Sequence, residues 1–123
     1  MNRNAARPVE IIEIYAKCDL LRGAAVIRNI VLFKLNEGVS PQSIEVENGL
    51  KMVEALEGQI PEIREWEVGR HALDSSPYSY DWALNSLFDD AESFQRYFNH
   101  PAHLAAISHW KDISSWIVVD MHV

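Results

Sequence analysis

The chain has 123 residues, of which 48% are hydrophobic and 24% are charged, as expected for one soluble globular domain with a single core. Its formal net charge of −7, with no basic stripe, argues against binding to nucleic acid or to an anionic membrane surface. No apolar stretch approaches the roughly 20 residues needed to span a bilayer, and Glu10 and Glu13 interrupt any secretory signal. Because the lone Cys18 cannot form an internal disulfide, we expect a cytoplasmic protein.

Residues 1–26 form an N-terminal extension whose pattern fits either an amphipathic helix or an added edge strand. The domain that follows begins with IRNIVLFKL, residues 27–35, a β-branched run of strand length. Ser40 as N-cap and Pro41 at the first helical position then predict a helix that continues to Glu57. The apolar side of this helix should consist of Ile44, Val46, Leu50, Val53 and Leu56.

The second half of the domain contains two more strands before its next helix. EIREWEVGRHA, residues 62–72, and YDWALNSLF, residues 80–88, both alternate in the manner of strands and are separated by a loop-forming segment. Asp89 or Asp90 predicts the start of a helix that ends at Phe98.

Pro101 predicts a second helical start, and this helix should continue to about Lys111. The closing strand is WIVVDMHV, residues 116–123. The complete order is βαββαβ, which predicts an α+β ferredoxin-like fold with one antiparallel sheet and helices on one face. Large apolar strand residues argue that the other face is covered, and sheet-on-sheet packing in a homodimer is the simplest cover. These residues are Val31, Phe33, Trp66 and Trp82.

Four segments resemble the stress-responsive A/B barrel domain family over roughly residues 27–123: IRNIVLFKL, Pro61 with EIREWEVG, YFNHPAH and IVVDMHV. The resemblance implies a dimeric α+β barrel, in which two ferredoxin-like subunits pack their sheets together and each keeps a pocket between sheet and helices. Some family members are plant stress proteins, and a few are cofactor-free enzymes, including a plant polyketide cyclase.

The resemblance also implies a candidate catalytic pair. The acid/base tyrosine and histidine of the cyclase fall on Tyr97 and His103, whereas two further pocket histidines of that enzyme are replaced by Asn29 and Trp82. The large ring of Trp82 should shrink or reshape the cavity. On the same basis we expect the pocket to be lined by Asn29, Val31, Phe33, Tyr80, Trp82 and His100.

Elementary chemistry adds a reason to consider this pair. Pro101 places His103 near the third helical position, where the positive end of the helix dipole disfavours the charged imidazole. A kink near His100 could bring Tyr97 toward His103, and a phenol with a neutral imidazole can deprotonate a carbon acid and hold the enolate oxygen. The alternative is structural, with His100 capping the helix and His103 bonding the sheet.

Other sites have less support in the sequence. No glycine-rich phosphate loop is present, so we expect no nucleotide cofactor. His100 and His103 have no carboxylate or thiolate nearby that would complete a metal site, so we expect no metal. Asp120 could form an ion pair with Arg28 or Arg70 at the dimer interface.

Three functions fit these observations. The first is a dimeric protein that binds a small apolar or aromatic molecule. The second is a cofactor-free enzyme (a polyketide cyclase, isomerase, lyase or oxygenase) that uses Tyr97 and His103 for proton transfer. The third is a purely structural oligomer whose pocket is filled by Trp82 and its neighbours. The replacement of two family histidines by Asn29 and Trp82 favours the first and the third.

Overall fold

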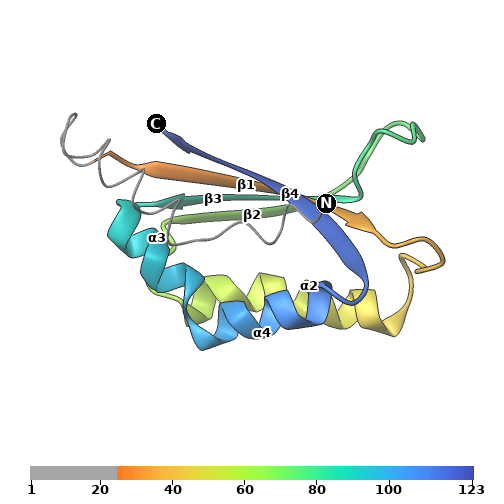
Figure 1. Cartoon of the computed structure of the whole chain (residues 1–123), viewed down its shortest axis with the longest axis horizontal. Helices are drawn as coiled ribbons and strands as arrows, with labels where there is room; N and C mark the ends of the chain where they lie inside the picture. The colour runs from red at the N-terminus through yellow and green to blue at the C-terminus, as the bar shows by residue number, and fades with distance from the viewer. Residues whose placement is uncertain (1–24) are drawn as a thin grey trace.

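The computed structural model describes residues 25–123, so the alternatives for the N-terminal extension lie outside the described residues. The order of the described elements confirms the predicted ferredoxin-like arrangement, in which the second helical segment is split in two (Figure 1). The elements are β1 (Ile27–Leu35), α2 (Ile44–Gln59), β2 (Glu65–Arg70), β3 (Trp82–Phe88), α3 (Ala91–Phe98), α4 (Pro101–Trp110) and β4 (Ser114–His122).

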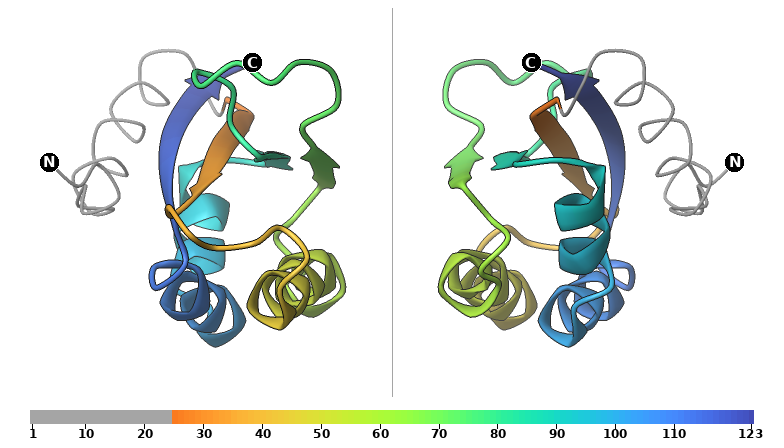
Figure 2. Two further views of the ribbon diagram at one scale, coloured as in Figure 1. Left: turned by 90° about the vertical axis from the view of Figure 1, so that its right-hand side faces the viewer. Right: turned by 90° about the vertical axis from the view of Figure 1, so that its left-hand side faces the viewer.

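The four strands form one antiparallel sheet in the order β2-β3-β1-β4. Figure 2 shows the helices together on one side of this sheet. The register places Asn29 between Ser86 of β3 and Asp120 of β4, and places Phe33 between Trp82 and Trp116. Because side chains alternate along a strand, all six of these residues point toward the helices.

Helix α2 begins later than the sequence predicts. The N-cap is Ser43, whose side chain accepts a hydrogen bond from the Val46 N–H at 3.4 Å. Ser40, the predicted cap, instead accepts a hydrogen bond from the Gln42 N–H within a turn. Ile44 is consequently 58% exposed, and the buried side of the helix begins at Val46.

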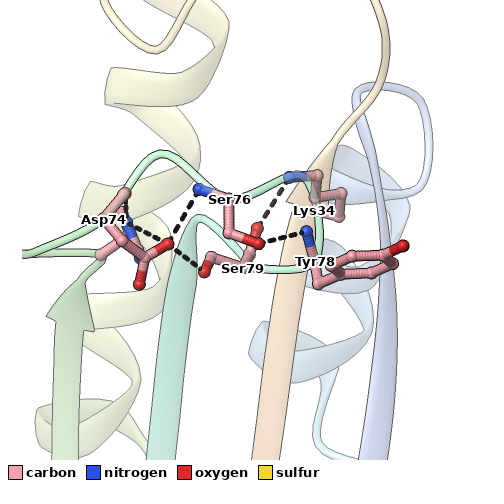
Figure 3. A network of polar contacts seen from close by, with 6 residues as sticks. Lys34, Asp74, Ser76, Tyr78 and Ser79 are labelled. Carbon is pink, nitrogen blue, oxygen red and sulfur yellow. Dashed lines mark hydrogen bonds and ion pairs between the residues drawn. The ribbon is translucent and has the colours of Figure 1, made fainter.

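Two strands are shorter than predicted, and the segment between them, residues 71–81, is a loop. Asp74 organises this loop by accepting hydrogen bonds from the Ser76 N–H at 2.9 Å and the Ser79 hydroxyl at 2.6 Å (Figure 3). Lys34 fastens the loop to β1 by donating to the Ser79 carbonyl at 2.8 Å. The expected strand residues at its ends therefore belong to a hydrogen-bonded connection and not to the sheet.

Helices α2 and α4 meet at Gly49, which has no side chain to separate them. The Trp110 indole lies against Gly49 and donates a hydrogen bond to its carbonyl at 3.1 Å. Beside it, His109 donates through Nε2 to the Glu45 carbonyl at 2.6 Å. The glycine that lowers the helix propensity of α2 therefore permits the close approach of α4.

The sheet face opposite the helices remains open within the described residues. The dimer was predicted from four apolar strand residues that were expected to need cover on this face. In the structure these residues, which include Trp66 and Trp82, point toward the helices, so the reason for that prediction was wrong. The open face carries a different apolar set, and Val119 and Met121 are 51% and 39% exposed there. This set consists of Ile30, Leu32, Ala83, Ile117, Val119 and Met121.

Candidate functional site

A cavity of about 470 Å³ lies between the sheet and the helices. Its walls are mainly apolar, and the predicted pocket residues Val31 and Phe33 form part of its floor. Leu104 of α4 and Val118 of β4 also line the cavity and are 45% and 48% exposed. The cavity therefore opens to solvent between α4 and the edge strand β4.

Tyr97 and His103 meet at the cavity wall. Their ring centroids lie 4.4 Å apart with an interplanar angle of 42°. The break between α3 and α4 produces this contact, because α3 ends at Phe98 and Pro101 starts a new helix whose first turn carries His103 back toward Tyr97. Both residues line the cavity, so the two side chains face the same space.

The hydrogen bond of His103 defines its tautomer. Nδ1 lies 2.8 Å from the Phe98 carbonyl oxygen, which can only accept, so Nδ1 carries the proton. In the neutral ring Nε2 then holds a lone pair and is free to accept a proton. Burial lowers the pKa of His103, and although the Phe98 hydrogen bond acts in the opposite direction, the neutral form is favoured. The expected contact of this histidine with the sheet is replaced by this contact with the end of α3.

Tyr97 lies in an aromatic cluster and is 3% exposed. Its ring centroid is 4.6 Å from that of Phe88 and 5.7 Å from that of Phe94. Burial raises the pKa of the Tyr97 phenol well above its usual range, since the phenolate would lose its hydration. The residue is therefore a neutral phenol that can donate a hydrogen bond into the cavity.

A second polar pair lines the sheet side of the cavity. The Asn29 amide, which is 3% exposed, donates a hydrogen bond to Oδ1 of Asp120 on the neighbouring strand. Burial raises the pKa of the Asp120 carboxyl to about 6. Asp120 was not predicted to be a pocket residue, although Trp116, Val118 and Asp120 alternate along one face of β4 and all three line the cavity.

The ion pair predicted for Asp120 does not form. Arg28 lies on the open face of the sheet, where it donates to Asn85 at 2.9 Å and pairs with Glu65 at 3.4 Å. Arg70 belongs to β2, the edge strand opposite β4, and its guanidinium lies 4.7 Å from the centroid of the Trp82 ring.

Three residues expected at the pocket are absent from the cavity wall. Tyr80 precedes β3 and belongs to the 71–81 loop. Trp82 packs in the core together with Val46 of α2 and so leaves the cavity open. His100 caps α4, because its Nδ1 accepts a hydrogen bond from the Ala102 N–H at 3.1 Å, as the structural alternative proposed.

Residues 25–123 contain no group of three or more histidine, cysteine or acidic side chains placed to bind a metal ion. They also contain no helix with the length and apolarity needed to cross a membrane.

The fold and the cavity together define a ferredoxin-like α+β domain with a ligand-sized cavity that opens to solvent. The chain belongs to the Stress responsive A/B Barrel Domain family, which matches residues 27–123. An uncharacterized protein of Streptomyces coelicolor is 42% identical over 95 residues, which cover 77% of this chain and 97% of the relative.

Two solved structures are similar to this fold. A dimeric protein of unknown function and ferredoxin-like fold from Bacteroides fragilis is 30% identical, with a TM-score of 0.69 over 80% of this chain and 96% of that chain. A hydroxynitrile lyase from Passiflora edulis is 17% identical, with a TM-score of 0.70 over 81% of this chain and 94% of that chain. At this identity the likeness to the lyase concerns the fold alone.

Proposed function

We propose that the protein binds a small apolar or aromatic molecule in the cavity between its sheet and helices. The observation that carries this proposal is the cavity itself, whose volume of about 470 Å³ falls within the range of ligand pockets. Its wall combines apolar side chains with a few polar groups at which a ligand can be oriented. The four polar residues are Asn29, Tyr97, His103 and Asp120.

The same arrangement argues against a purely structural role. That alternative requires Trp82 and its neighbours to fill the pocket, whereas Trp82 packs in the core with Val46. The cavity opens to solvent and its wall combines apolar with polar side chains, a form that suits the binding of a ligand and not the completion of a core.

We further propose that the functional unit is a homodimer that packs the open sheet faces together. The open face presents an apolar patch that includes Val119, 51% exposed, and Met121, 39% exposed. Such a patch favours burial against a second copy. The similar Bacteroides fragilis protein, at 30% identity, is described as dimeric. Val119→Lys should convert the dimer to monomer in sedimentation experiments, whereas Ala55→Lys, which adds the same charge at an exposed position of α2 on the other side of the sheet, should not.

Binding is tested by ligand-induced thermal shifts against phenolic, β-polyketone and fatty-acid-like compounds. Val118→Trp is the informative variant, because its ring would obstruct the opening between α4 and β4 without entering the core. We expect shifts in the wild type and their loss in Val118→Trp, with the ligand-free melting temperature little changed. Equal shifts in both proteins would mean that the compounds bind elsewhere.

A second candidate function, proton transfer, is favoured by the contact between Tyr97 and His103. The lone pair on His103 Nε2 suits a general base, and the neutral phenol of Tyr97 suits a donor to an enolate oxygen. The hydroxynitrile lyase of similar fold is an enzyme, so the same fold carries a catalytic site in that relative. If the wild type turns over a substrate and both Tyr97→Phe and His103→Asn retain that activity, this catalytic role is contradicted.

A further inference from the structure

The carboxyl group of Asp120 is the one acidic side chain that residues 25–123 place in the cavity wall. It lines an apolar cavity and is opposed by the Asn29 amide, which holds only Oδ1. Within residues 25–123 no lysine or arginine pairs with Asp120, and none lines the cavity. A half-buried acid without a cationic partner reduces stability, which is the usual mark of a group retained for binding or catalysis.

The geometry of the pair leaves one acceptor for a ligand. A carboxylate offers two oxygens with about four lone-pair positions, and a single amide hydrogen bond occupies one of them. Asn29 is itself held in place, because Ser86 donates to its backbone carbonyl at 3.3 Å and its side chain is buried. Oδ2 of Asp120 is therefore a fixed acceptor at the floor of the cavity. Since burial raises the pKa of Asp120 to about 6, the group is ionised at neutral pH.

The surroundings also determine which charge a ligand can carry. The other titratable groups that residues 25–123 place in the cavity wall are His103, whose pKa is lowered by burial, and Tyr97, whose pKa is raised, so both are neutral. The chain as a whole has a formal net charge of −7, which repels anions. Among residues 25–123, no cationic side chain in the cavity wall compensates a ligand carboxylate, whereas a ligand ammonium would compensate Asp120.

We propose that Asp120 is the specificity-determining residue of the cavity. The cavity binds apolar molecules that end in a hydrogen-bond donor. A protonated amine is preferred over a hydroxyl group, and a carboxylate is rejected. This inference rests on the proposed small-molecule function. The apolar body lies among Val31, Phe33 and Val118, and the head group reaches Asp120 on the same sheet face.

A matched series of probes tests the order of preference. 2-Phenylethylamine, 2-phenylethanol and phenylacetate share one ring and differ in the charge of the head group. By calorimetric titration of the full chain at neutral pH, we expect the amine to bind about tenfold more tightly than the alcohol, because a hydrogen bond between two charged groups is stronger. Phenylacetate should bind most weakly.

Two variants separate the site from the overall charge. Asp120→Asn keeps an oxygen that can accept from Asn29 but removes the charge, so the amine should lose its advantage while the alcohol binds as before. Asp112→Asn makes the same change in net charge at an exposed position outside the cavity wall and should leave the order intact.

Each outcome decides between the two proposals. Equal binding of all three probes, a preference for phenylacetate, or an unchanged order in Asp120→Asn would overturn the role of Asp120 and leave the cavity as a binding site. If none of the probes binds and the wider panel of compounds also gives no thermal shift, the proposed function fails together with this inference.

Discussion

The substitution Gly49→Ala tests the packing that supports the roof of the cavity. A Cβ atom at Gly49 would lie 2.7 Å from two ring atoms of Trp110 and 2.9 Å from the His109 ring. Such distances require the indole to move, and Trp110 also lines the cavity. The change therefore affects both the α2–α4 contact and the space available to a ligand.

The expected change in the free energy of unfolding combines three contributions, of which one stabilises the variant and two destabilise it. Alanine should gain about 1 kcal/mol of helix propensity over glycine. Overpacking costs about 1–3 kcal/mol, and loss of the hydrogen bond from Trp110 to the Gly49 carbonyl costs about 0.5–1.5 kcal/mol. We expect a net loss of about 0.5–3.5 kcal/mol in the free energy of unfolding. In a domain of this size each kcal/mol lowers the melting temperature by roughly 4 °C.

Gly58→Ala provides the matched control in the same helix. A Cβ atom at Gly58 meets nothing within 4 Å, and Gly58 has no positive φ. This variant should therefore gain about 0.5–1 kcal/mol. Urea unfolding of both variants and the wild type, followed by circular dichroism, measures the difference. If Gly49→Ala is stabilised as much as Gly58→Ala, the packing argument is wrong.

Three further outcomes follow from the site and the loop. His103→Asn can still donate a hydrogen bond to the Phe98 carbonyl, so its free energy of unfolding should be about 0.5–1.5 kcal/mol higher than that of His103→Ala. Thermal melts of the two variants measure this difference. Because the pKa of Asp120 is raised to about 6, its stability contribution is present below its unfolded pKa and is lost as the pH rises through 6. Wild type should thus lose stability relative to Asp120→Asn between about pH 4 and pH 6, and parallel curves in urea titrations would refute this. Asp74→Ala should speed amide hydrogen exchange of Ser76 and leave the melting temperature nearly unchanged, and exchange that stays slow would show that other contacts hold the loop.

The sequence predicted the existence and the order of the strands, because alternation is a local property, but it did not show which sheet face the helices cover. Residues 27–35 form β1 with the predicted bounds, and the break at Pro101 correctly predicted two separate helices. The start of α2 was wrong because Ser40 and Ser43 are both good caps, and a turn at Gln42 decides between them.

The features that were missed depend on contacts between distant parts of the chain. The need for Gly49 arises from Trp110, which reaches it only through the packing of α4 on α2. Asp120 becomes a cavity residue through its register opposite Asn29 on β1. Neither the register nor the helix contact is encoded in a local pattern.

The central claim, that a ligand occupies the cavity beside His103, is tested most directly by NMR of the histidine side chains. The imidazole resonances are followed during titration with the compound that gives the largest thermal shift. We predict a saturable change at His103, whereas His71 and His109, which are outside the cavity wall, should remain unchanged. A titration that leaves His103 unmoved, or that moves all three histidines equally, would contradict the account.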